Sequence, residues 1–140
     1  MLNIMEMALA SSYLSTLHAA IQAAGWSQML SQPGPFTIFA PNEEAFAKLP
    51  LGSVEDLLKD IPKLQETLAY HIVEGNEMRA ELVQQASMRT LHGRKISIAL
   101  HNGIKVNQAN LVESDIACEN GVIHIIDAVL MMPTIKFTVA

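Results

Sequence analysis

Five histidines, fourteen acids and one cysteine are the side chains from which this sequence could build a reactive or metal-binding site. The histidines are far apart, at His18, His71, His92, His101 and His124, and no short His–His or Cys–Cys spacing places two ligands on one element. Zinc sites usually combine such closely spaced pairs. The sequence therefore predicts no metal site and no bound cofactor.

His124 is the strongest candidate for acid–base catalysis, because Asp127 follows three residues later and Ser114 lies upstream. In a regular strand, residues three apart point to opposite faces, so the histidine–aspartate hydrogen bond of a triad would need a bulge. The sequence also lacks a Gly-x-Ser-x-Gly turn, a P-loop and a dinucleotide fingerprint. We expect His124 and His71 to be hydrogen-bonded structural residues, and the chain not to be an enzyme.

Two adjacent acids, Glu43 and Glu44, follow the apolar run at residues 36–40. Asn42 precedes them as a potential N-cap, and acids in a first turn face the positive end of a helix. Neighbouring residues on a helix point in different directions, so the pair cannot flank one bond as catalytic carboxylates do. Helix initiation is the better interpretation.

The single cysteine, Cys118, excludes an internal disulfide. Its neighbours Asp115-Ile116-Ala117 and Glu119-Asn120-Gly121 include no basic residue that could lower the pKa of the thiol. We expect a small packed or half-exposed side chain rather than a reactive one.

Length and composition favour one globular domain, since the chain has 140 residues, half of them apolar and 16% charged. The net charge is −5 and the nine basic residues are scattered, so nucleic acid is not an expected partner. No stretch approaches 18 apolar residues, and the N-terminus lacks a basic leader. We expect either a cytoplasmic protein or a mature form without its leader.

The elements that must position these residues are helical in the first half of the chain. A stripe from Leu14 to Ala24 has helical spacing and ends at Gly25. Ser53 with Asp56 predicts a capped helix, a second helix should begin near Asp60, and a turn or two is expected over 78–85.

The last third of the chain has the period of strands. Ile96, Ile98 and Leu100 alternate with other residues, Asn102-Gly103 is typical of a hairpin, and Ile104 and Val106 follow on the return strand. The nearly continuous apolar run at 122–130 predicts a central strand, and residues 70–73 a short one. These patterns indicate a single α+β domain.

Four segments in this order resemble the fasciclin-like domain family over roughly residues 2–133. They are NIMEMALASSYLSTLHAAIQAAG, GPFTIFAPNEEAFAKLP and NGVIHIIDAVLMMP, with the pair Tyr70-His71 between the last two. The resemblance implies a wedge of about seven strands in two sheets with helices packed along one side. The domain should span 1–133, and the tail at 134–140 has no assigned role.

Family members are generally secreted or cell-surface adhesion proteins without enzymatic activity, so the resemblance implies an extracellular interaction module with a protein or glycan partner. Several animal members contact integrins through an Asp-Ile pair, which matches Asp115-Ile116 here. The stretch around Tyr70 and His71 is also implicated, although its apolar members fit a folding role equally well. As a single short domain the chain resembles microbial members, for which an integrin is not the expected partner.

A second hypothesis is a carrier of an apolar ligand such as a carotenoid or lipid, because some algal relatives bind carotenoids. The eight methionines could supply an adaptable apolar groove.

Overall fold

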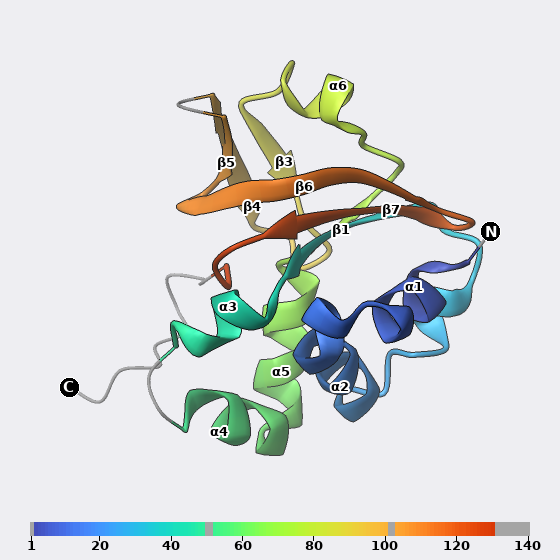
Figure 1. Cartoon of the computed structure of the whole chain (residues 1–140), viewed down its shortest axis with the longest axis vertical. Helices are drawn as coiled ribbons and strands as arrows, with labels where there is room; N and C mark the ends of the chain where they lie inside the picture. Colours follow the sequence, from blue (N-terminus) through green and yellow to red (C-terminus); the bar gives the residue numbers. More distant parts are fainter. Residues whose placement is uncertain (1, 50–51, 101–102, 131–140) are drawn as a thin grey trace.

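The computed structural model describes residues 2–49, 52–100 and 103–130, and it places a layer of helices against one face of a curled sheet (Figure 1). The helices are α1 (Ile4–Ala10), α2 (Ser15–Ala23), α3 (Glu43–Ala47), α4 (Ser53–Lys59), α5 (Ile61–Ala69) and α6 (Arg79–Leu82), with short 3-10 turns η1 (Ser12–Leu14) and η2 (Met29–Ser31). The strands are β1 (Phe36–Pro41), β2 (Ile72–Glu74), β3 (Ser87–Arg89), β4 (Lys95–Leu100), β5 (Ile104–Val106), β6 (Ala109–Cys118) and β7 (Gly121–Ile126).

Hydrogen bonds link the seven strands in the continuous order β2-β1-β7-β6-β5-β4-β3. Only the β1–β7 pair is parallel, and the other pairs are antiparallel. The two ends of this order approach each other, because Leu91 N donates to Ile72 O at 2.8 Å just after β3. The predicted α+β class and the seven strands are confirmed, and the sheet is nearly closed on itself.

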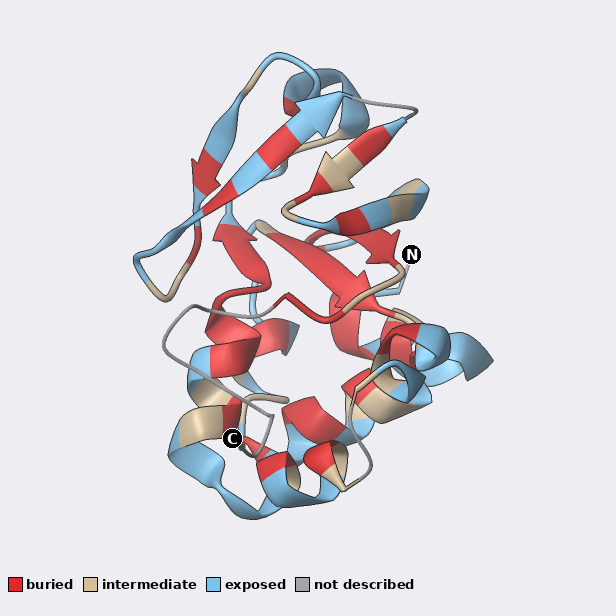
Figure 2. Cartoon of the chain, turned by 90° about the vertical axis from the view of Figure 1, so that its left-hand side faces the viewer, coloured by how far each residue is buried: buried red, intermediate tan, exposed pale blue. Residues whose placement is uncertain are grey.

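Strand β7 lies between β1 and β6, and all six of its residues are buried (Figure 2). Its alternate side chains divide between two apolar clusters. Ile123 and Ile125 pack with the helices, while Ile126 packs with Phe39 and strands β4 and β5. Both faces of β7 are therefore covered, and its nearly continuous apolar sequence is the pattern expected for a central strand.

The helix starts follow the capping residues in the sequence, with one exception. Asn42 accepts from Ala45 N at 2.9 Å, and Asp60 accepts from Lys63 N at 3.3 Å. The prediction that Ser53 caps α4 is wrong, because the N-cap is Gly52 in a left-handed conformation and Ser53 is the buried first residue of the helix.

Three other details differ from the sequence prediction. Tyr70 and His71 end helix α5 and turn the chain, so strand β2 begins only at Ile72. The strand predicted through Leu130 ends at Ile126, and Leu100 is exposed at the end of β4. Asn102, the methionines at 131–132 and the tail at 134–140 lie outside the described residues.

Candidate interaction surface

Asp115 lies at an irregularity in the long strand β6. The register with β7 shifts between Leu111 and Glu113 and again between Glu113 and Ile116. Asp115 has φ 60°, in the left-handed region that non-glycine residues rarely adopt, although aspartate tolerates it better than most. The side chain of Asp115 is exposed. The irregular strand therefore holds an exposed carboxylate at a backbone conformation that a regular strand does not have.

Three hydrogen bonds hold this bulge against the segment that leads into α6. The Asp115 carboxylate accepts from Arg79 N at 2.7 Å, and Asp115 N donates to His124 Nδ1 at 3.2 Å. His124 Nε2 lies 2.7 Å from Glu77 O. Because Nδ1 accepts a main-chain N–H, the proton must be on Nε2, which donates to Glu77. The neutral side chain of His124 thus joins strand β7 to the bulge and to the segment that leads into α6.

The environment of His124 favours this neutral form. The side chain has no exposed surface, and its ring stacks on Phe39 with centroids 5.7 Å apart. Burial lowers the pKa of His124, while the Glu77 carbonyl and the Asp115 charge oppose that shift. The sequence prediction of a hydrogen-bonded structural histidine agrees with these contacts. Sequence pattern alone does not predict that His124 supports Asp115, because the bulge that joins them is a tertiary feature.

Ile116 follows Asp115 and is half-buried against the core cluster between the helices and the sheet. It is paired with Ile123 of β7. The exposed carboxylate thus stands beside an apolar side chain that is fixed by packing, so a partner would meet one charge and part of one apolar surface.

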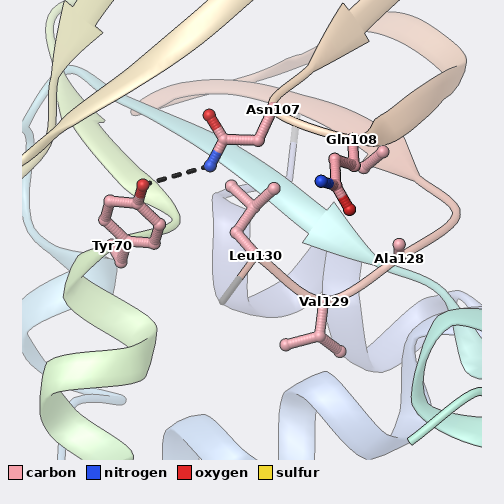
Figure 3. A pocket seen from close by; sticks show the side chains of 7 residues that line it. Tyr70, Asn107, Gln108, Ala128, Val129 and Leu130 are labelled. Atoms are coloured by element: carbon pink, nitrogen blue, oxygen red, sulfur yellow. Dashed lines mark hydrogen bonds between the residues drawn. The ribbon is translucent and has the colours of Figure 1, made fainter. Parts of the chain in front are cut away.

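Tyr70 and His71 are placed differently, because both are buried, with 4% and 2% of their surface exposed. Tyr70 Oη donates to Lys95 O at 3.3 Å and accepts from Asn107 Nδ2 at 3.1 Å, as Figure 3 shows for the second contact. These bonds join the end of α5 to β4 and to the turn after β5. The structure does not bring this pair together with Asp115 on one exposed surface.

His71 joins α5 to the end of the chain's described part. Its Nε2 accepts from Leu130 N at 2.9 Å, so its Nδ1 carries the proton and donates to Thr67 O at 2.7 Å. Burial lowers the pKa of His71 to about 4, against the opposing effect of the Thr67 hydrogen bond. Both ring nitrogens are satisfied inside the protein, which is the pattern of a structural residue.

The described residues offer no arrangement typical of nucleophilic catalysis. Asp127 accepts from Asn110 N and Nδ2 at 2.8 and 2.9 Å and lies 3.8 Å from Lys48 Nζ, instead of orienting His124. Burial raises the pKa of Cys118 to about 11, so the thiol is a weak nucleophile. Within residues 2–49, 52–100 and 103–130, no three histidine, cysteine or acidic side chains gather as metal ligands.

A cavity for a carotenoid or lipid is also not evident in the described residues. The enclosed apolar space between the helices and the sheet, near Leu64 and Val129, has about 20 Å³, whereas pockets for drug-sized ligands have roughly 300–1,000 Å³. The larger hollows, of about 360 to about 630 Å³, are open to solvent, and polar or charged side chains such as Asn107 (Figure 3), Glu66 and Glu74 line them. The structure does not support the carrier hypothesis.

Helices of the described segments are all too short or too polar to cross a membrane.

Comparison with known proteins gives a consistent result over nearly the whole chain. The Fasciclin domain family model matches residues 12–133. The chain is 41% identical over 130 residues to the uncharacterized protein sll1735 of Synechocystis, covering 93% of this chain and 98% of that protein. It is 34% identical to the pig transforming growth factor-beta-induced protein ig-h3 and 36% identical to human periostin, covering 96% and 88% of this chain.

The chain spans only 20% and 15% of the length of these two animal proteins, so it is similar to one part of each. A solved domain pair from the insect cell adhesion molecule Fasciclin I superposes with a TM-score of 0.82 at 18% identity, covering 94% of this chain and 51% of that one. At this identity the structural likeness shows the fold alone. Together with the family match it gives one conclusion: this chain belongs to the fasciclin domain family.

Proposed function

We propose that this chain is a non-catalytic adhesion module that acts outside the cell and binds a protein or glycan of a cell surface or matrix through Asp115 and Ile116. The observation that carries the proposal is the conformation of Asp115. An exposed carboxylate is held at positive φ by bonds to Arg79 and His124.

Backbone strain of this kind costs about 1–3 kcal/mol and occurs preferentially at functional positions. A regular β6 would avoid the strain, and Asp115 N–H would need no histidine. Because the geometry of the bulge is already fixed, this segment loses less conformational entropy when a partner binds, and the smaller loss favours affinity. The exposed carboxylate can accept charge-assisted hydrogen bonds from a partner, and Ile116 supplies apolar contact beside it.

Tyr70 and His71 enter this proposal as residues that maintain the fold, because both are buried and internally bonded. Their substitution should affect binding through stability and not through lost contacts. The adhesion role itself is supported by membership of the fasciclin domain family, which the similarity to ig-h3 and periostin accompanies.

The first test uses fluorescent beads coated with the domain and cells of the organism that makes it. The variant Asp115→Asn removes the charge but keeps an oxygen that can accept from Arg79 N and a residue type that tolerates positive φ. We expect bead attachment to fall about tenfold, the loss typical of one charge-assisted hydrogen bond at a contact, with the melting temperature within about 2 °C of the parent.

The matched control is Asp56→Asn, which removes an exposed carboxylate from the first turn of α4. It should leave attachment unchanged. Equal attachment of Asp115→Asn and parent beads would contradict the proposal.

A further inference from the structure

Strand β2 lies at one end of the strand order and leaves part of its outer edge open. His71 O accepts from Phe39 N, and Gly75 N donates to Pro35 O, both at 2.9 Å. Hydrogen-bonded residues alternate along an antiparallel pair, so Ile72 and Glu74 direct their main-chain groups away from β1. Leu91 N occupies Ile72 O. Among the described residues, no hydrogen bond occupies the main chain of Glu74.

The nearly closed sheet is therefore incomplete at Glu74. Three adjoining hollows share this residue. One lies beside the loop at 32–36, a second is bounded by Arg89 to Gly93 next to β3, and the third, of about 630 Å³, extends to Trp26 and helix α5. An extended peptide has room along this edge, and an open edge with unpaired main-chain groups is a template for strand addition.

The side chains around the third hollow combine apolar surface with acids. Trp26, Phe36 and Leu91 line it and are half-buried. Glu66 and Glu74 line it too, both are exposed, and neither carboxylate has a hydrogen bond or ion pair within the described residues. This arrangement is complementary to a basic side chain with an apolar stem, which can contact an aromatic face and reach a carboxylate.

Two other charged or titratable groups border the hollows. Arg89 is the one lysine or arginine among the residues that line the three of them, and it belongs to the hollow next to β3. His92 lines the third hollow, packs edge-on against Tyr70, and has a buried Nδ1 without a hydrogen-bond partner in the described part of the chain. Among the described residues that line the third hollow, no lysine or arginine thus balances the negative charges of Glu66 and Glu74.

We propose that the open edge of β2 at Glu74 binds an extended segment of a protein partner in which lysine or arginine alternates with apolar residues. The segment adds a strand beside Glu74 and turns its basic side chains to the third hollow, where their apolar stems contact Trp26, Phe36 and Leu91 and their charged ends pair with Glu66 and Glu74. This surface shares no residue with the Asp115 surface, so it does not depend on the adhesion proposal.

The sequence contains one tryptophan, Trp26, and its fluorescence reports on the hollow directly. The probe is the capped peptide Val-Lys-Val-Lys-Val, with Val-Glu-Val-Glu-Val as its matched control. We expect the basic peptide to shift Trp26 emission with a saturable curve and the acidic peptide to leave it unchanged. A basic peptide methylated on its main-chain nitrogens should bind at least tenfold more weakly, because it cannot pair with a strand.

Glu74→Gln and Glu66→Gln should each weaken binding of the basic peptide about threefold, as expected for exposed ion pairs. Glu55→Gln, at an exposed acid of α4, should not change it. Equal binding of the two peptides, indifference to methylation, or indifference to both substitutions would overturn the proposal. So would saturable binding of neutral maltohexaose at Trp26 without binding of the basic peptide, since the hollow would then be a glycan site.

Discussion

His71 and His124 each have one ring nitrogen without a proton, because a main-chain N–H donates to it. If that nitrogen took up a proton, the ring N–H and the main-chain N–H would face each other inside the core with no acceptor between them. Both side chains are buried, and burial lowers the pKa of each. At the scale of single residues, the protein therefore depends on two neutral imidazoles, one under the Asp115 bulge and one at the end of α5.

This dependence predicts a loss of stability in mild acid. The pKa of His71 is about 4 in the folded protein and about 6.5 when unfolded, so between these values the unfolded chain binds more protons. Stability is complete above pH 6.5 and falls as the pH drops toward 4, by about 3 kcal/mol for His71. His124 contributes in the same direction.

Urea unfolding at pH 7 and pH 4.5 measures this loss. Carboxylates also begin to take up protons in that range, so the ring protons of His71 should be followed by NMR as a direct control. A folded-state titration of His71 near 6.5 would contradict the prediction.

Residue types alone predicted that His71 and His124 are hydrogen-bonded structural residues, but not which groups they contact. The lack of closely spaced ligand pairs and of a nucleophile turn in the sequence argues against a zinc site and a hydrolase triad. The role of His124 depends on a bulge, and a bulge changes which residues share a face. Asn120 is a similar case. Its buried side chain accepts from Ile4 N and donates to Leu30 O and Gln32 O, and local pattern does not predict these contacts with distant segments.

At the scale of elements, the acids Glu43 and Glu44 begin helix α3 as expected, but only one of them has a second role. The Glu43 carboxylate accepts from Thr16 N at 2.6 Å and from Thr16 Oγ1 at 2.8 Å. Thr16 is in the first turn of α2, where main-chain N–H groups lack partners within the helix. Glu43 thus caps a second helix from outside, and so joins α3 to α2.

We predict that Glu43→Ala lowers the free energy of unfolding by about 1 kcal/mol more than Glu44→Ala, the cost of losing a helix cap. Glu44 is a close control, because it is exposed, lies in the same first turn and has no side-chain hydrogen bond to α2 within the described residues. Chemical denaturation of the two variants measures the difference. Equal losses would mean that the bonds to Thr16 do not stabilise the fold.

Element types were predictable wherever local pattern and packing agree. The helix starting at Asp60, the hairpin strands around Gly103 and the central strand β7 follow from capping, turn chemistry and continuous apolar sequence. The strand predicted at 70–73 was wrong for its first two residues. The β-branched Ile72 and Val73 suggested a strand through the whole segment, whereas Tyr70 and His71 end helix α5 and turn the chain. Ser53 is not the N-cap of α4, because Gly52, which adopts positive φ freely, occupies the N-cap position one residue earlier.

At the scale of the whole molecule, the curled sheet determines which surfaces are available. Helices cover one face (Figure 1) and the second apolar cluster fills the other, while the bulge of β6 and the open edge of β2 are among the features that stay exposed in the described residues. The order and near-closure of the strands depend on contacts far apart in sequence, such as Leu91 with Ile72. Family resemblance predicted this architecture, whereas local pattern predicted only its α+β class.

The enclosed space of about 20 Å³ among the helices also gives a prediction for the molecule as a whole. Protein purified from its own source should be colourless, and native mass spectrometry should show no mass beyond that of the polypeptide. A visible absorption band, or a stoichiometric mass increase from a lipid or carotenoid, would contradict this prediction.

The most direct test of the adhesion proposal compares a surface residue with a buried one from the same predicted contact set. Asp115→Asn should reduce bead attachment about tenfold at an unchanged melting temperature. Tyr70→Phe removes the hydroxyl that bonds Lys95 O and Asn107 Nδ2, so it should lower stability by about 1 kcal/mol and leave attachment of folded protein unchanged. The opposite outcome, lost attachment for Tyr70→Phe and full attachment for Asp115→Asn, would contradict the assignment of the contact surface to Asp115.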